Sequence, residues 1–343
     1  MTMHPPVSDS RRDLGRFGVF LLRGMAPRTA WWLAHRGALR RHDYRGVPFA
    51  VLESAWRADP SWVDLDIRDG RVHSRTLGMD LVAHDPVAAD YRAVCALRTK
   101  GFTVERQADG LRLRHARWTF SLRNAEHLNM AREIFIDECY ALSTSRPAVV
   151  IDIGANIGLA SLYFAAQPRV ERVYSFEPFP ATYALLEGNV AANPELARKI
   201  ALAAIGLADK DATLAVDYDP AWSGSMSTTG VGAWRPRSGG ATESTTIRLE
   251  PASRHVASIR SRHPGVPLVA KIDCEGSEYP ILQELDQTGL LPSLDVVLME
   301  WHQRQPDELL QRLERHGFMA QARPLAPDRT LGLITAWRAP YSS

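Results

Sequence analysis

The sequence predicts a doubly wound α/β domain with a mostly parallel sheet over residues 146–343. Three observations support this fold class. Short apolar segments alternate with helical patterns from Arg146 onward, a glycine-rich turn follows the first apolar segment, and acidic residues follow several later ones. Ligands of such sheets bind at the carboxyl ends of the strands. The sequence therefore also predicts where a site lies.

Each predicted element follows from its pattern. The apolar segments are too short for helices and are predicted to be buried strands, at residues 148–153, 172–176, 200–205, 268–272 and 296–300. Helical patterns follow the first two strands, at residues 158–166 and 181–190. Residues 223–240 are rich in Gly, Ser and Thr and are predicted to be a functional or disordered loop.

The chain is predicted to have three parts. Residues 1–100 are rich in Arg and Trp, and short helical patterns interrupted by prolines predict a mainly helical extension. Residues 101–145 lead into the main domain through a helix and a β-hairpin, whose strands at 102–106 and 111–114 alternate around Asp109-Gly110; residues 118–122 add a further strand. Residues 146–343 form the α/β domain.

Composition excludes few classes of protein. The 343 residues are 45% hydrophobic and carry a net charge of +2, which does not indicate a nucleic-acid binder. Nine arginines against three aspartates make residues 1–50 basic, and we interpret these charges as a solvated face rather than a surface for anionic lipid or an acidic partner. These arginines are Arg11, Arg12, Arg16, Arg23, Arg28, Arg36, Arg40, Arg41 and Arg45.

Cysteine usage and hydropathy indicate a cytoplasmic protein. Cys95, Cys139 and Cys274 are odd in number and widely spaced, which fits neither a disulfide framework nor a zinc site. Arg11-Arg12 and the apolar residues after them faintly resemble a twin-arginine signal, but that apolar stretch is too short. No run approaches the ~18 apolar residues of a membrane span, so we expect no transmembrane segment.

The glycine-rich turn at residues 152–158 is the predicted ligand cradle. Gly154 and Gly158 allow the backbone to pass close to a ligand, and the following helix presents free N–H groups. A purely structural turn also uses glycine. The position of this turn after a buried strand, and Glu177 about 20 residues beyond Gly158 at the end of the next strand, favour ligand binding. We expect Glu177 to accept hydrogen bonds from the hydroxyls of a ribose, rather than to be a solvated strand end.

The chemistry of the turn favours a methyl donor over a dinucleotide. Its pattern is Gly-x-Asn-x-Gly, which lacks the glycine that allows close approach to a pyrophosphate. S-adenosylmethionine has a ribose but no phosphate. Asn156 can lie beside its amino-acid portion, and we expect Asp152 to help hold its ammonium group.

A second group of polar residues follows two later strands. Asp273 and Glu275 come after residues 268–272, and Glu300 and His302 come at the end of the next strand. Because neighbouring parallel strands end at one edge, these side chains are predicted to share a rim with the ligand. An isolated histidine is usually structural, whereas one beside several carboxylates is a candidate for catalysis.

At this point the sequence resembles the FkbM family of methyltransferases over about residues 110–320. The resemblance rests on residues 152–158, 176–178, 271–278 and 300–302, with 133–135, Tyr140 and 223–227 also similar. It implies a Rossmann-like class I methyltransferase fold with a seven-stranded sheet, and S-adenosylmethionine bound over Gly154 and Glu177. It also implies methylation of a hydroxyl on a small-molecule acceptor, a sugar or a polyketide-type natural product. We expect Asp273 to contribute to the donor site as well.

Two mechanisms remain open at this level. In the first, which we favour, His302 is the general base and Asp273 or Glu275 orients it or the substrate. In the second, Asp273, Glu275 and Glu300 hold a divalent cation that acidifies the hydroxyl. The rival functions are a nicotinamide-dependent oxidoreductase, which the missing glycine disfavours, and a donor-binding or scaffold protein without turnover.

Overall fold

The computed structural model describes residues 65–68, 71–81, 86–218 and 243–338. The chain forms two compact units, one containing residues 1–115 and 122–132 and the other residues 116–121 and 133–343. The arginines of residues 1–50 and the loop at 223–240 lie outside the described residues, so the predictions made for them stay predictions.

The first unit contains a small sheet, two helices and a hairpin. Its elements are β1 (Leu65–Arg68), β2 (Arg71–Ser74), β3 (Met79–Leu81), α5 (Pro86–Ala89), α6 (Tyr91–Thr99), β4 (Thr103–Gln107) and β5 (Gly110–Arg114). Strands β4 and β5 form the predicted hairpin, whereas the antiparallel sheet β1–β2–β3 was not predicted. Strands of three and four residues are too short to show a period of two. Helix α6 begins after Asp90, whose side chain accepts a hydrogen bond from the Ala93 N–H at 3.0 Å.

Two elements connect this region of the chain to the second unit. Strand β6 (Thr119–Leu122) lies where the sequence predicts a strand, and helix α7 (Ala125–Phe135) follows it. Within the second unit, the backbone N–H groups of Thr119 and Ser121 donate to the side chains of Asn193 and Asn189, both at 2.8 Å. The side chains of Asn193 and Asn189 thus satisfy two backbone N–H donors of β6.

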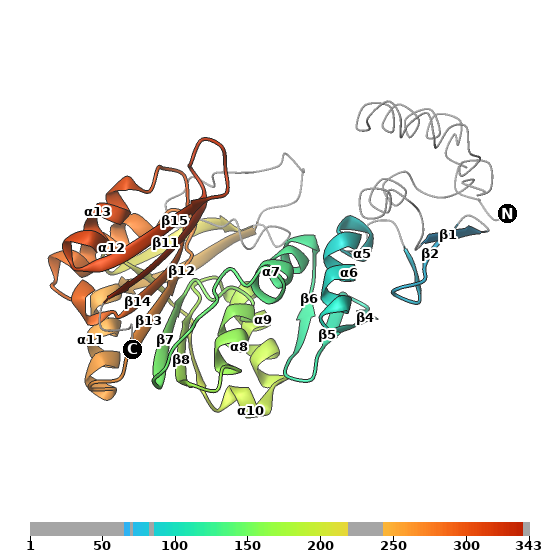
Figure 1. Ribbon diagram of the computed structural model, residues 1–343, viewed down its shortest axis with the longest axis horizontal. Helices are drawn as coiled ribbons and strands as arrows, with labels where there is room; N and C mark the ends of the chain where they lie inside the picture. Colours follow the sequence, from blue (N-terminus) through green and yellow to red (C-terminus); the bar gives the residue numbers. More distant parts are fainter. Residues whose placement is uncertain (1–64, 69–70, 82–85, 219–242, 339–343) are drawn as a thin grey trace. The chain divides into compact units, whose positions relative to one another are not determined.

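The second unit is built around a seven-stranded sheet in the order β15-β16-β14-β13-β7-β8-β9 (Figure 1). Its strands are β7 (Ala148–Ile153), β8 (Val170–Phe176), β9 (Ile200–Ala203), β13 (Leu268–Ile272), β14 (Val296–Trp301), β15 (Phe318–Pro324) and β16 (Gly332–Arg338). The pairs from β14 through β9 are parallel, and β16 is antiparallel to both of its neighbours. This confirms the predicted mostly parallel, seven-stranded sheet of class I methyltransferases.

Helices cover both faces of this sheet (Figure 1). Helices α8 (Leu159–Ala165), α9 (Pro180–Ala191) and α10 (Pro194–Ala197) lie on one side, and α11 (Ala252–Arg262), α12 (Glu278–Gln287) and α13 (Asp307–Arg315) on the other. Helix α13 shows why such segments fold as helices. Asp307 and Glu308 occupy its first turn and Arg312 and Arg315 its last, which complements the helix dipole, while Leu309 and Leu313 form its buried stripe.

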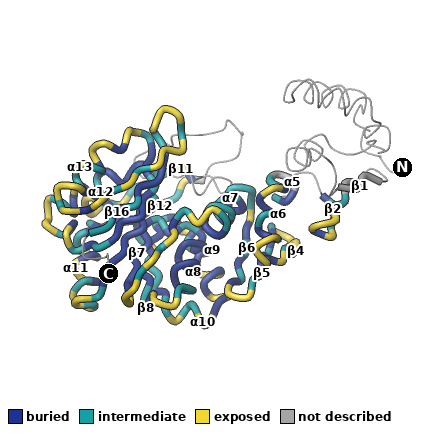
Figure 2. The backbone as a smooth tube through the Cα atoms, in the orientation of Figure 1, coloured by how far each residue is buried: buried dark blue, intermediate teal, exposed yellow. Residues whose placement is uncertain are grey.

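The central strands are buried from end to end, and Figure 2 shows this core in dark blue. Every residue of β7 and of β13 is buried, as continuous apolar strands between two helical layers should be. A second, smaller sheet in the order β10-β12-β11 was not predicted. It contains β10 (Gly206–Ala208), β11 (Ala212–Tyr218) and β12 (Glu243–Pro251), and it packs through its own apolar cluster, which includes Ile247 and Leu249.

The chain order of the sheet sets the position of the site. From β7 the chain proceeds outward to β8 and β9, and it then returns to β13 on the other side of β7. The carboxyl ends of β7 and β13 therefore form the switch point at which doubly wound sheets bind ligands. Among the described residues, no helix is both long and apolar enough to cross a membrane.

Candidate active site

Four neighbouring strands are paired with one another through a single row of residues, which lies immediately before the site in each strand. In order across β8, β7, β13 and β14, it consists of Phe176, Ile153, Ile272 and Met299. The residue that follows each of them is, in the same order, Glu177, Gly154, Asp273 and Glu300. The register therefore brings the predicted glycine and three predicted carboxylates to one edge, although they are widely separated in sequence.

The glycine turn has a backbone that few other residues tolerate. Gly154, Asn156 and Gly158 all adopt left-handed conformations, with φ of 76°, 47° and 88°. A Cβ on Gly154 would lie 1.9 Å from the carbonyl oxygen of Asp273, so the turn after β7 closely approaches the end of β13. Asn156 accepts the N–H of Ile157 on its own Oδ1 at 2.8 Å, which offsets part of its strain.

Glu177 is buried and is joined directly to this turn. Its Oε2 accepts the N–H of Asn156 at 2.9 Å, and its Oε1 accepts the N–H of Phe179 at 3.0 Å. Burial raises the pKa of Glu177 to about 7, against these two backbone hydrogen bonds, which lower it. The structure thus places Glu177 beside the turn, as the sequence predicts, and its contact with a ribose stays a prediction.

Lys271 is a buried cation beneath the turn, and sequence analysis assigned it no role. Its Nζ donates to the Gly154 carbonyl oxygen at 2.5 Å and pairs with Asp152 Oδ1 at 3.2 Å and Asp273 Oδ2 at 3.6 Å. Burial lowers the pKa of Lys271, but the charges of Asp152 and Asp273 outweigh it and hold the pKa above its ordinary value. A lysine inside a predicted strand gave the signal, because an isolated buried charge requires a partner.

Asp152 is fully buried, and its two carboxylate oxygens face Ser161 and Lys271. Its Oδ2 accepts the hydroxyl of Ser161 at 2.6 Å, and its Oδ1 faces Lys271. Asp152 lies one residue before the edge of the sheet, and its help in holding the donor ammonium stays a prediction. In this structure its carboxylate holds Lys271, which in turn holds the glycine turn.

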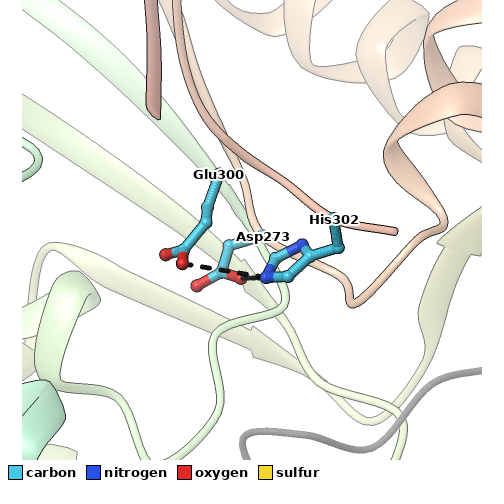
Figure 3. A group of neighbouring side chains, drawn as sticks. All are labelled: Asp273, Glu300 and His302. Carbon is cyan, nitrogen blue, oxygen red and sulfur yellow. Dashed lines mark ion pairs between the residues drawn. The ribbon is translucent and has the colours of Figure 1, made fainter. Parts of the chain in front are cut away.

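The structure brings together the four predicted residues of the rim. His302 Nε2 lies 3.6 Å from Glu275 Oε1, 3.8 Å from Glu300 Oε1 and 4.0 Å from Asp273 Oδ1. Figure 3 shows the side chains of Asp273 and Glu300 directed toward this nitrogen. The imidazole at the carboxyl end of β14 therefore lies beside Glu300 of the same strand and beside the carboxylates that follow β13, as the sequence predicts.

Glu278 orients the imidazole, and sequence analysis did not assign it this role. It is fully buried in the first turn of α12, where its two oxygens accept the N–H groups of Cys274 and Gly276, each at 2.9 Å. Its Oε1 also lies 3.0 Å from His302 Nδ1. Because the backbone holds Glu278 rigidly, the ring of His302 is fixed with Nε2 toward the other carboxylates. The motif contains Glu278, but only the tertiary contact shows what it binds.

The surroundings of His302 determine its charge. Burial alone would lower the pKa of His302, but the hydrogen bond with Glu278 and the charges of Glu278, Glu275 and Asp273 outweigh it and raise the pKa to about 10. These surroundings favour the protonated form of the imidazole. The general-base role of His302 stays a prediction. Burial also raises the pKa of Glu300.

Tyr140 adds a contact from a segment that precedes the first strand of the sheet. Its buried hydroxyl donates to Asp273 Oδ2 at 2.9 Å, so that carboxylate is held by both Tyr140 and Lys271. Burial, and then the charge of Asp273, hold the pKa of Tyr140 well above its usual range. Tyr140 thus acts as a hydrogen-bond donor that fixes one oxygen of Asp273.

The two loops at this rim carry backbone strain. Glu275 and Gln303 have φ of 52° and 68°, in the left-handed region that residues other than glycine rarely adopt. The Gln303 Nε2 donates to the Glu275 carbonyl oxygen at 2.9 Å, which ties the loop after β14 to the loop after β13. Strain held in place by such contacts is typical of functional sites.

Comparisons with known proteins identify a methyltransferase domain in this chain. Residues 152–319 match the family model described as the methyltransferase FkbM domain. The methyltransferase sdnD of Sordaria araneosa is 37% identical over 103 residues, which cover 29% of this chain and 39% of that protein, so the match spans less than half of its length. The 31-O-demethyl-FK506 methyltransferase FkbM of Streptomyces tacrolimicus is 29% identical over 241 residues, 60% of this chain and 88% of that protein.

Among solved structures, the methyltransferase FkbM of Methylobacillus flagellatus KT is similar over 96% of this chain and 60% of that chain, with 14% identity and a TM-score of 0.39. The family model spans the glycine turn, Glu177 and the whole His302 rim. Through this domain, the chain is similar to the FkbM family of methyltransferases.

Proposed function

We propose that this methyltransferase transfers the methyl group of S-adenosylmethionine to a hydroxyl of a small molecule, a sugar or a polyketide-type natural product. One observation supports this most strongly. The glycine turn and Glu177 are hydrogen-bonded together at the switch point, and the group around His302 follows on the next two strands of the same edge. A donor site and a site for acceptor chemistry therefore adjoin. The name of the Streptomyces relative, a 31-O-demethyl-FK506 methyltransferase, is consistent with this acceptor class.

The reaction requires alignment more than chemical assistance. A lone pair of the acceptor oxygen forms the new O–C bond, the C–S bond breaks, and its electron pair stays on the sulfur. The hydroxyl proton leaves to a base or to water. Because the sulfonium loses its charge in this step, a site that excludes water and holds the two reactants in line supplies most of the acceleration. In this proposal, the partly buried carboxylates around His302 act on the acceptor proton.

The first expected result is selective binding of the methyl donor. Calorimetry on the full chain should detect S-adenosylmethionine and its demethylated product, but neither NAD nor FAD, because Gly-x-Asn-x-Gly lacks the close approach that a pyrophosphate needs. Release of the demethylated product in the presence of hydroxylated sugars and polyketides then identifies the acceptor. Tight NAD binding without any response to S-adenosylmethionine would refute the proposal.

A second expected result concerns Glu177. If its carboxylate accepts the ribose hydroxyls, Glu177→Ala weakens donor binding by about 1.5–3 kcal/mol, the range for hydrogen bonds to a charged group. The control is Glu195→Ala, which removes an exposed carboxylate of α10. Unchanged donor affinity in a folded Glu177→Ala protein would leave Glu177 with a structural role only, since it also accepts two backbone N–H groups.

Glu177 also predicts a pH dependence with a definite sign. Its pKa is raised to about 7, and the ionised form is the better acceptor for two hydroxyls. Donor affinity should therefore rise with pH through 7, by up to about tenfold between one pH unit below the pKa and the plateau above it. In Glu177→Gln, calorimetry across this pH range should give a flat profile. A wild-type profile that is also flat would exclude this role for the ionised carboxylate.

A further inference from the structure

Three side chains of metal-binding type converge at the ends of β13 and β14 (Figure 3). Asp273, Glu300 and His302 each offer one ligand atom, and these atoms all lie within 4.8 Å of one another. His302 Nε2 is 3.8 Å from Glu300 Oε1 and 4.0 Å from Asp273 Oδ1. Both distances exceed those of hydrogen bonds. The three groups approach a common point without bonding to each other.

We propose that Asp273, Glu300 and His302 bind one divalent cation of the Mn²⁺ type, which also binds the acceptor hydroxyl. The contact between the cation and the acceptor hydroxyl rests on the proposed function, whereas the binding of the cation itself does not. Bonds of about 2.1–2.2 Å place ligand atoms about 3 Å apart at adjacent positions of an octahedron and about 4.3 Å apart at opposite positions. The two separations from His302 Nε2, 3.8 and 4.0 Å, lie between these values, so small side-chain rotations bring the ligand atoms to coordination distance.

The arrangement around His302 supports this site independently. A histidine that binds a metal almost always donates its other ring N–H to a carboxylate or carbonyl. Here Glu278 accepts from Nδ1 at 3.0 Å, and two backbone N–H groups fix Glu278 itself. Nε2 is thereby aimed at the carboxylates, and the cation takes the place of its proton. Likewise, Tyr140 and Lys271 hold Oδ2 of Asp273, which leaves Oδ1 toward the site.

The set of ligands indicates the class of ion. Two carboxylates and one imidazole contain no thiolate, and the imidazole favours a transition-metal ion over Ca²⁺, which takes oxygen ligands. Structural zinc sites use four protein ligands, whereas three leave open positions. An octahedral ion such as Mn²⁺ then has room for the acceptor oxygen. Bound there, the hydroxyl loses its proton to water or to a carboxylate of the group more readily.

The test measures the ion directly, without an acceptor. The full chain, freed of metal with EDTA and dialysed, is titrated with Mn²⁺, and free Mn²⁺ is followed by its electron paramagnetic resonance signal. We expect one Mn²⁺ per chain, displaceable by Mg²⁺. Asp273→Asn and Glu300→Gln should weaken binding by more than about tenfold, and Glu278→Gln by about 10–100-fold, the range for groups that orient a ligand. Glu195→Gln, an exposed carboxylate of α10, should bind as the wild type.

Three other results would contradict one of the two proposals. If the wild type takes up neither Mn²⁺ nor Mg²⁺, the site does not exist. If Asp273→Asn and Glu300→Gln, folded by circular dichroism, bind Mn²⁺ as the wild type does, the ion lies elsewhere. Calorimetry with S-adenosylmethionine on the same samples separates the two proposals. Donor binding without Mn²⁺ binding overturns the metal site alone, and Mn²⁺ binding without donor binding overturns the proposed function alone.

Discussion

Replacing His302 with alanine should lower turnover by about 10²–10⁴-fold, the contribution of a positioned group that handles a reacting proton. The imidazole lies within 4.0 Å of three carboxylates and is held by Glu278, so its removal disrupts the whole acceptor side of the site. Donor affinity should stay close to that of the wild type, because Gly154 and Glu177 lie on other strands. Release of demethylated donor measures the first quantity, and calorimetry measures the second.

A second histidine provides the control for this substitution. His263 follows α11 and precedes β13, so it belongs to the opposite end of the strand from the site, and His263→Ala should keep full turnover. Chelation separates the possible roles of His302. If EDTA abolishes activity and Mn²⁺ or Mg²⁺ restores it, His302 belongs to a metal site. In that case Asp273→Asn should lower turnover at least as much as His302→Ala does. A folded His302→Ala enzyme with full turnover and no sensitivity to EDTA would leave catalysis to alignment alone.

Replacing Lys271 with methionine should lower the free energy of unfolding by about 3–5 kcal/mol, the cost of leaving a buried partner charge uncompensated. Lys271 is 2% exposed and Asp152 is fully buried, and their charged atoms lie 3.2 Å apart. The substitution also removes the donor that holds the Gly154 carbonyl oxygen. Urea denaturation followed by circular dichroism measures the loss.

A double variant tests the physical reason for this loss. Asp152→Asn removes the charge that Lys271→Met leaves behind, so the double variant should recover part of the lost stability, whereas two independent sites would show additive losses. An exposed ion pair provides a matched control. Arg198→Met breaks the pair with Glu195, whose side chains are both about three-quarters exposed, and should change stability by less than about 1 kcal/mol. Equal effects of Lys271→Met and Arg198→Met would contradict the assigned role.

The parallel sheet was predictable because its strands are buried on both faces. An apolar segment such as β13 shows the same pattern whatever its neighbours are, and its observed bounds coincide with the predicted ones. The sheets β1–β2–β3 and β10–β12–β11 were missed for the converse reason. The strands β1, β2 and β3 are too short to show a period, and β10 becomes a strand by pairing with the distant β12, which no local pattern shows.

The convergence of the site was predictable from strand ends alone. Gly154, Glu177 and Asp273 each follow a strand and Glu300 lies near the end of one, and neighbouring parallel strands in register must bring them together. Tyr140 reaches Asp273 from outside the sheet, and Glu278 reaches His302 from the start of a helix. Neither contact follows from periodicity or spacing, because each depends on how separate elements pack.

The sequence by itself determined the fold class, the glycine turn and the residue types at the edge of the sheet, because strand burial and strand ends are properties of local pattern. Only the tertiary structure decided which of these groups contact one another and in which direction their pKa values shift. Asp152 lies one residue short of the edge and is buried with Lys271, and the pKa of His302 is raised because Glu278, Glu275 and Asp273 lie close to it. Burial and charge proximity depend on distances between strands, and those distances exist only once the chain has folded.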